Sequence, residues 1–168
     1  QIFIMNADGT DVMPLTLAAE SAQLAGWSPD SSQILYGAKD ERGATKVRLI
    51  NIATGDITDL FSVDFDAPSP AFSPDGQWIA YLDRVPGRMA GGIYLSHPDG
   101  TEKNLAVQLD YWMVGNVSWS PDGKWLVFDV LNTDLYIPTS TTGLLNLETC
   151  QVIPLINLDG TIQTWVNP

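Results

Sequence analysis

The sequence predicts an all-β fold made of four-stranded antiparallel sheets that repeat along the chain. Two short phrases recur at nearly the same period. The first is an aromatic residue followed by Ser-Pro-Asp, and it begins at Trp27, Phe72 and Trp119, with spacings of 45 and 47 residues. The second is a turn phrase that closes at positions 9, 55, 100 and 150, with spacings of 46, 45 and 50. Two independent markers with one period indicate a repeated supersecondary unit, as in solenoids, propellers and other arrays.

The unit that begins at Pro70 shows how the residues predict the strands. A short strand ends at the turn Pro74–Gly76, where proline presets φ and glycine tolerates a positive φ. An aromatic and aliphatic run at Trp78–Leu82 predicts a buried strand, and Gly92–Ser96 predicts a third strand. A fourth, weaker strand is expected over 102–106. Four strands joined by short turns form the antiparallel meander of a propeller blade.

The whole chain, 1–168, is therefore expected to form a single β-propeller domain, either partial or four-bladed. Complete blades are expected over 24–61, 69–106 and 116–155. Residues 1–16 supply only the third and fourth strands of a blade, and residues 162–168 supply only a first strand. These two segments are expected to share one split blade, which would remove exposed sheet edges. A truncated larger propeller and a ring closed by two chains remain open alternatives.

The repeated residues are assigned to structure rather than to a site. The aromatic residue that begins each copy, at positions 27, 72 and 119, is expected to pack in the core between neighbouring blades. The aspartate of each Pro-Asp turn is expected to cap its own backbone. These turn aspartates are Asp30, Asp75 and Asp122.

Composition excludes several classes of protein. Hydrophobic residues make up 45% of the chain, which excludes a disordered polymer. Eight basic against 20 acidic residues give a formal net charge of −12, so the acidic chain is not expected to bind nucleic acid or an anionic membrane surface. No stretch approaches 18 consecutive apolar residues, so no membrane span is expected. No basic-then-apolar signal segment begins the chain, so no signal peptide is expected in it.

Residues suited to catalysis are sparse. The single histidine, His97, lies in a predicted turn, and the single cysteine, Cys150, takes the place that glycine has in the other three turns. Nucleophilic catalysis of the familiar kind needs a serine or cysteine beside a positioned base, and His97 is the only histidine that the sequence offers for that role. The sequence also has no Gly-x-Ser-x-Gly phrase and no His or Cys cluster with metal-ligand spacing. We expect no catalytic residues and no enzyme activity.

Candidate binding residues lie in the loops that differ between repeats. In a meander the connections from strand two to strand three, and those from blade to blade, emerge on one side, here called the loop face. These loops are expected over 39–45, 83–91, 129–141, 17–24, 62–69 and 107–116. Aromatic residues and arginine dominate binding hot spots, although loop aromatics can also fold back onto the blades. The candidate residues are Asp64, Phe65, Asp66, Arg84, Arg88, Asp110, Tyr111, Trp112 and Met113.

Carboxylates in these loops raise the question of a metal ion. Asp64, Asp66 and Asp110 could offer oxygen ligands to calcium at the centre of the ring. Asp-x-Asp alone lacks the glycine and the distal glutamate of an EF-hand loop. We therefore expect no metal site and no cofactor, with calcium as the weaker alternative.

The repeat resembles that of a known family. The stretch Ile2–Thr10, followed by Pro14–Thr16 and Trp27–Asp30, closely resembles the repeat of TolB-like propeller proteins: a strand, an NADG turn, LT, WSPDG and a strand. The resemblance covers nearly the whole chain, in three full copies and two partial ones. TolB-like propellers typically carry six blades, which is more than this chain can build. The same repeat occurs in the periplasmic Tol component, in propellers of prolyl-oligopeptidase-type peptidases, in some polysaccharide lyases and in bacterial surface proteins.

The resemblance implies a binding platform outside the cytoplasm, for example in the periplasm. Three functions follow as hypotheses. The first is a non-catalytic scaffold that binds a protein or peptide through the loop face. The second is a carbohydrate-binding or sugar-processing propeller that uses loop carboxylates such as Asp64 and Asp110. The third is a structural fragment that associates with copies of itself to complete the ring, as an oligomer.

Overall fold

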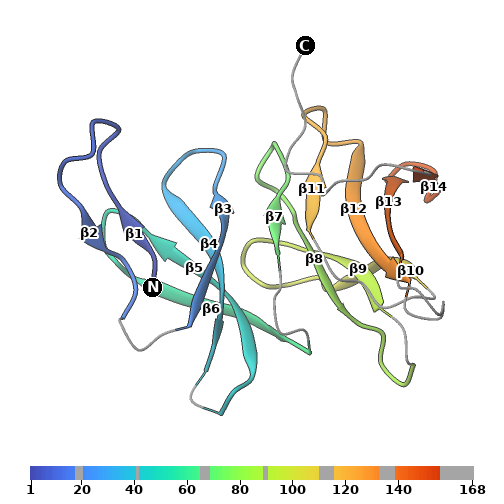
Figure 1. Cartoon of the computed structure of the whole chain (residues 1–168), viewed down its shortest axis with the longest axis horizontal. Coiled ribbons are helices and arrows are strands. Elements are labelled where there is room, and N and C mark those ends of the chain that lie inside the picture. Colours follow the sequence, from blue (N-terminus) through green and yellow to red (C-terminus); the bar gives the residue numbers. More distant parts are fainter. Residues whose placement is uncertain are drawn as a thin grey trace.

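The computed structural model describes residues 1–17, 21–40, 42–64, 69–88, 91–109, 116–132 and 139–155. The described residues form strands β1 to β14 and contain no helix. The strands belong to separate antiparallel sheets, which follow one another in an arc (Figure 1). This arrangement confirms the predicted all-β fold class of repeated antiparallel sheets.

The sheets are numbered here in chain order. Sheet 1 has two strands, β1 (Phe3–Ile4) and β2 (Met13–Pro14). Sheet 2 contains β3 (Ala22–Trp27), β4 (Gln33–Lys39), β5 (Thr45–Asn51) and β6 (Ile57–Val63). Sheet 3 contains β7 (Ala71–Phe72), β8 (Ile79–Arg84), β9 (Gly91–Ser96) and β10 (Asn104–Leu109). Sheet 4 contains β11 (Val117–Trp119), β12 (Trp125–Asn132), β13 (Thr139–Asn146) and β14 (Val152–Leu155).

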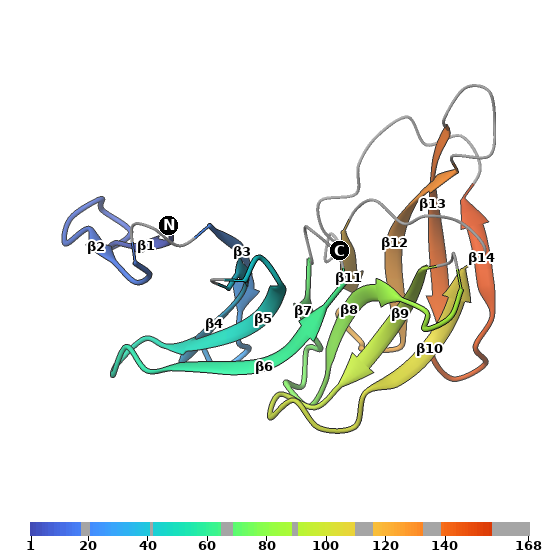
Figure 2. The same cartoon turned by 90° about the horizontal axis from the view of Figure 1, so that it is seen from below.

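Each complete sheet is a meander in which every strand pairs with the next one along the chain. In sheet 3, for example, Tyr81 lies opposite Tyr94 in the antiparallel ladder. The first strands of the complete sheets adjoin one another, because β7 contacts both β3 and β11. Sheets 1 and 4 lie at the two ends of the arc, and Figures 1 and 2 agree on this placement.

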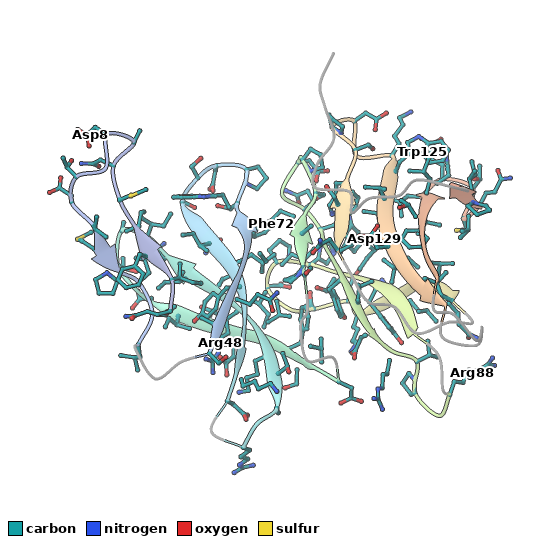
Figure 3. The ribbon with its side chains drawn as sticks, viewed as in Figure 1. Asp8, Arg48, Phe72, Arg88, Trp125 and Asp129 are labelled. Carbon is teal, nitrogen blue, oxygen red and sulfur yellow. The ribbon has the colours of Figure 1, made fainter. Side chains whose placement is uncertain are left out.

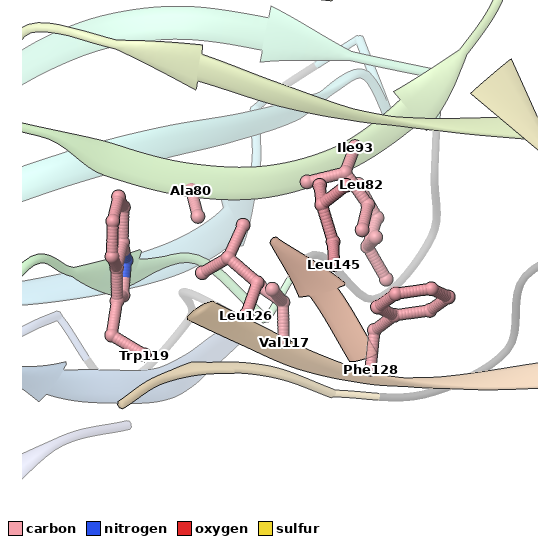
Figure 4. Close-up of a cluster of buried hydrophobic side chains, with 8 residues drawn as sticks. All are labelled: Ala80, Leu82, Ile93, Val117, Trp119, Leu126, Phe128 and Leu145. Atoms are coloured by element: carbon pink, nitrogen blue, oxygen red, sulfur yellow. The ribbon is translucent and has the colours of Figure 1, made fainter. Parts of the chain in front are cut away.

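The core lies between successive sheets. The buried cluster between sheets 3 and 4 brings Ala80, Leu82 and Ile93 against side chains of β11, β12 and β13 (Figure 4). A second cluster joins sheets 2 and 3, and a third joins the short sheet 1 to sheet 2. Burial on both faces explains why the second strand of each unit is a continuous apolar run rather than an alternating one.

The Pro-Asp turns share one hydrogen-bond pattern. The hydroxyl of the preceding serine donates to Oδ1 of Asp30, Asp75 or Asp122 at 2.6 Å in all three turns. A backbone N–H two residues after each aspartate donates to the same oxygen at 3.0 to 3.1 Å. The serine hydroxyl is the main cause that lowers the pKa of each carboxyl group, in Asp30 to about 2. The turns are thus closed by their own side chains.

The Pro-Asp turns of neighbouring sheets also contact one another. A methyl group placed on Gly76 would lie 3.6 Å from the ring of Pro29, which belongs to the turn of the preceding sheet. A methyl group on Gly123 would lie 3.8 Å from the ring of Pro74 in the same way. The proline of one turn therefore rests against the glycine of the next.

The structure corrects the assignment of Trp27 to the core. Trp27 is 49% exposed, whereas its counterpart Trp119 is 8% exposed. The indole Nε1 of Trp119 donates to the carbonyl of Ala71 at 2.9 Å, and the ring packs against Ala80. These partners belong to the first and second strands of the preceding sheet. Before Trp27 the preceding sheet consists of β1 and β2 alone, so the described residues supply no such strands.

Several strand ends differ from those expected. β8 continues to Arg84 and β12 to Asn132, because their ladders with β9 and β13 continue beyond the apolar run. The fourth strand of sheet 3 begins at Asn104 and ends at Leu109, later than the expected 102–106. The expected pairing of residues 1–16 with 162–168 falls on a segment that lies outside the described residues.

Candidate functional site

The loop face is the rim where one sheet is joined to the next. The chain leaves β6 at this rim, and the backbone N–H of Asp64 donates to Oδ1 of Asp83 in sheet 3 at 2.8 Å. In sheet 4, where the chain enters β11, the N–H of Asp129 in β12 donates to the carbonyl of Asn116 at 3.3 Å. Figure 3 shows Arg88 at this rim, on the side opposite the turn that carries Asp8.

Asp83 is the centre of the site. Its side chain is buried, and Oδ1 also accepts a hydrogen bond from the N–H of Arg84 at 2.8 Å. Oδ2 accepts from the ammonium group of Lys103 at 2.6 Å. The Lys103 nitrogen lies 5.0 Å from the centre of the Tyr94 ring and 5.6 Å from that of Tyr81. These four side chains, of Asp83, Lys103, Tyr81 and Tyr94, are called the Asp83 cluster.

The Asp83 cluster has a structural role, because its groups are neutral or paired and hold the backbone of the rim in place. Burial is the main cause that raises the pKa of Tyr81 and of Tyr94, so both phenols stay neutral over the physiological range. The hydroxyl of Tyr94 donates to the carbonyl of Arg84 at 3.2 Å. The buried carboxylate of Asp83 needs its hydrogen bonds and the ammonium group of Lys103, because an unpaired charge away from water is costly. The cluster therefore fixes the backbone at Asp64 and Arg84 in one geometry.

The predicted loop-face residues divide into two groups. Asp64, Arg84 and Arg88 are described and exposed, and the first two are brought together through Asp83. Arg88 follows in the turn after β8, where its N–H donates to the carbonyl of Val85 at 3.1 Å. The predicted residues that lie outside the described part of the chain are Phe65, Asp66, Asp110, Tyr111, Trp112 and Met113.

Sequence reasoning missed the two charged residues that organise this rim. Asp83 follows directly after the apolar run Trp78–Leu82, and a carboxylate at the end of a buried strand signals that a partner is needed. Its partner Lys103 is 20 positions away and has no such signal. The pair depends on how β8 and the start of β10 lie in space, which the sequence pattern does not contain.

His97 and Cys150 both lie in turns, as expected. The ring of His97 stacks on Trp78 with centroids 4.2 Å apart, and its Nδ1 lies 2.9 Å from the carbonyl oxygen of Gln77. Cys150 is exposed and has a φ of 56°, in the region where the equivalent turn positions have glycine. Both residues therefore have roles in turn structure.

The described part of the chain contains neither a metal-binding cluster nor a membrane-spanning helix. Within it, no group of three His, Cys, Asp or Glu side chains is arranged to hold a metal ion. Of the three aspartates considered for calcium, only Asp64 is described. Within the same residues, no helix is long and apolar enough to cross a membrane.

Asp129, in β12, carries a testable pH effect. Thr142 donates to its Oδ1 at 3.3 Å, and Oδ2 has no hydrogen-bond partner among the described residues. Burial raises the pKa of this carboxyl group above its ordinary value of 3.8. The native state therefore holds the proton more tightly than the unfolded chain. Stability is lost as the pH rises from 3.8 through the raised pKa, and the loss persists at neutral pH.

We expect Asp129→Asn to raise the urea midpoint at pH 7, because the amide carries no charge to be desolvated. The gain should shrink as the pH falls and should vanish below the ordinary carboxyl pKa, where wild type is also neutral at this position. Urea titrations at pH 3.5, 5 and 7 measure this difference. A gain that is independent of pH would show that desolvation of the carboxylate is not the cause.

Comparison with known proteins places the fold. No family model matches the sequence, and no curated protein matches it. Among solved structures, a TolB structure from Agrobacterium tumefaciens superposes with a TM-score of 0.75 and 20% identity, over 90% of this chain and 55% of the other. TolB from Acinetobacter baumannii superposes with a TM-score of 0.76 and 19% identity, over 95% of this chain and 38% of the other. An oligogalacturonate lyase in complex with manganese superposes with a TM-score of 0.66 and 17% identity, over 91% of this chain and 46% of the other.

These likenesses are low in sequence identity, and they establish the fold alone. The chain spans about half the length of the structures it matches, or less. The repeated sheets, their meander order and the packing between them agree with this result. The fold is a β-propeller fold, and its structural neighbours are TolB-like β-propellers.

Proposed function

We propose that this chain is a non-catalytic scaffold that binds a protein or peptide on its loop face. The observation that carries the proposal is the bridge at Asp83, which holds Asp64 of one sheet connection beside Arg84 of the next sheet. Recognition on loops held by a rigid scaffold is a common way in which such folds function. The TolB structures among the neighbours support a role in binding.

The charges at this rim indicate the chemistry of the partner. Arg84 and Arg88 are both exposed and lie four positions apart around the β8–β9 connection. Guanidinium groups recognise carboxylates through paired hydrogen bonds, and arginine is enriched in binding hot spots. In a chain with a net charge of −12, two exposed arginines on one connection are a local exception to the acidic surface. We therefore propose a peptide segment with carboxylate side chains as the ligand.

The test begins with selection of peptides from a random library on the immobilised chain, followed by isothermal titration calorimetry of the best binder. We expect the double variant Arg84→Ala/Arg88→Ala to weaken binding at least tenfold, because two charge-assisted contacts are lost. The matched control is Lys124→Ala/Glu148→Ala, an exposed pair at the opposite rim whose side chains are 3.2 Å apart. Failure to select any binder, or equal weakening by both double variants, would contradict the proposal.

Carbohydrate binding through Asp64 and Asp110 remains the alternative, and among the described residues only Asp64 bears on it. A thermal-shift titration with oligogalacturonate, with and without manganese, separates the two functions. Stabilisation by the sugar, lost in Asp64→Asn, would favour the alternative.

We further propose that the protein acts outside the cytoplasm and needs no cofactor. A rise in melting temperature on adding calcium would contradict the second point.

A further inference from the structure

A cleft lies between the Pro-Asp turns of sheets 2 and 3, at the rim opposite the loop face. It has a volume of about 230 Å³ and is here called the turn cleft. A single water molecule needs about 10–15 Å³ of such space, so the turn cleft can admit a small organic group. Figure 3 shows Phe72 at this junction. The side chains that give the cleft its chemical character are Pro29, Asp30, Gln33, Phe72, Asp75 and Gln77.

Smaller side chains explain why space remains at this junction. Gln33 and Trp78 are equivalent, because the carbonyl of each accepts from the N–H of its turn serine, at 2.9 and 2.8 Å. At the junction of sheets 3 and 4, Trp78 and Trp119 occupy the places that Gln33 and Phe72 have in the turn cleft. Both indoles pack with the cluster between those sheets. The cleft is therefore a property of this junction and not of the repeat as a whole.

The turn cleft is acidic and has no cation of its own. Asp30 and Asp75 line it from its two sides, and the pKa of each carboxyl group is lowered, chiefly by the hydroxyl of the turn serine. Both are therefore ionised at neutral pH. Of the described residues, no lysine or arginine lines the cleft. The two carboxylates thus face the cleft without a partner of opposite charge in its lining.

The turn of sheet 4 differs at one informative position. Lys124 is equivalent to Gln77, because the N–H of each donates to Oδ1 of its turn aspartate, at 3.1 and 3.0 Å. The hydroxyl of the turn serine is the main cause that lowers the pKa of Asp122, and the charge of Lys124 contributes. Sheet 4 therefore supplies a cation beside its turn carboxylate, whereas the turn cleft has a neutral amide at the same position.

We propose that the turn cleft binds a guanidinium group, either of a free small molecule or of an arginine side chain in a peptide. Both turn hydrogen bonds of Asp75 end on Oδ1, which leaves Oδ2 for the N–H groups of a ligand. The amide oxygens of Gln33 and Gln77 are further acceptors in the lining. Phe72 and Pro29 line the same cleft, and a planar cation packs well on such rings.

A metal ion fits these side chains less well. Calcium takes about six to eight oxygen ligands and gains nothing from an aromatic ring, whereas the turn cleft has two carboxylates and a phenyl ring. An ammonium group is a compact point charge and does not use a planar set of acceptors as a guanidinium group does. The turn cleft shares no residue with the loop face, so this site is independent of the proposed function.

The first test is a titration of the whole chain, followed by NMR spectra of its backbone amides. The ligands are free arginine and the capped tripeptide Gly-Arg-Gly, and the comparison is citrulline, in which an uncharged urea group replaces the guanidinium group. We expect shift changes at Gln33, Gly76 and Gln77, and citrulline should bind at least about tenfold more weakly. Tighter binding of the peptide than of arginine supports a peptide side chain as the source, and the reverse supports a free small molecule. No change at these amides, or equal binding of citrulline, would overturn the proposal.

The second test supplies the cation from the protein itself. Gln77→Lys copies the residue that the turn of sheet 4 already has, so the fold should be retained. Arginine should then bind at least about tenfold more weakly, because like charges repel at close range. Asp75→Asn keeps an oxygen that accepts from Ser73 but removes the charge, and it should weaken binding as well. The matched control is Gln151→Lys, which adds the same charge at an exposed glutamine before β14. Equal weakening by the two lysine variants would show that net charge alone is responsible and would overturn the proposal.

Discussion

Trp119→Ala is expected to lower the free energy of unfolding by about 3–5 kcal/mol, the usual cost of truncating a buried aromatic residue. The indole fills the cluster between sheets 3 and 4, where it packs with Val117 and Leu126, and its Nε1 donates to the carbonyl of Ala71. Removal leaves a cavity and breaks the hydrogen bond to the carbonyl of Ala71. Urea denaturation followed by circular dichroism measures the change.

The matched variant is Trp27→Ala, at the equivalent position of sheet 2. Because Trp27 is 49% exposed, its truncation in dilute protein should lower the free energy of unfolding by less than about 1 kcal/mol, as surface substitutions generally do. The two substitutions are chemically identical, so the difference between them isolates the effect of the preceding sheet. Equal losses would mean that Trp27 is covered in solution by the monomer itself.

Gly100→Ala is expected to be the most damaging substitution among the turn glycines. Gly100 has a φ of +82°, and a methyl group there would lie 2.7 Å from the carbonyl oxygen of Leu60 in β6. The left-handed conformation costs about 1–2 kcal/mol for a residue with a Cβ. Overpacking against a backbone atom that cannot rotate away adds about 1–3 kcal/mol. Gly100→Ala should therefore lower the free energy of unfolding by about 2–5 kcal/mol in total.

Gly9→Ala provides the comparison, because Gly9 occupies the same turn position with a φ of +85° and nothing within 4 Å of the added methyl group. Gly9→Ala should lower the free energy of unfolding only by the cost of the left-handed backbone conformation, about 1–2 kcal/mol. Thermal unfolding of both variants beside wild type is sufficient. Should Gly9→Ala prove as damaging as Gly100→Ala, the close approach of Gly100 to β6 would add no steric cost to the substitution.

The local part of this fold could be predicted from the sequence. The Pro-Asp-Gly turns depend on φ preferences and on side chains two residues away, so the phrase itself encodes them. The position of β8 followed from its apolar run, since a strand buried on both faces has no polar residues within it. The period then ordered the strands into sheets without any long-range information.

The remaining features depend on contacts between units, which no single phrase contains. Trp27 carries the same local sequence as Trp119, and its exposure depends on strands that precede it in space. The pair of Asp83 and Lys103 joins the end of one strand to the start of another. The extension of β8 to Arg84 depends on its partner Gly91, which continues the ladder. Each miss therefore concerns a neighbour rather than the residue itself.

The contact between the proline of one turn and the glycine of the next has a consequence for chain length. The turn of sheet 3 carries both halves of this contact, Pro74 for the following sheet and Gly76 for the preceding one, whereas the turn of sheet 2 has Ser31 at the position of the glycine. A unit that has both residues, like sheet 3, can therefore be duplicated or deleted by recombination at the gene level, and its turn junctions are already complementary. A single architecture can in this way occur in chains of different lengths without redesign of its joints.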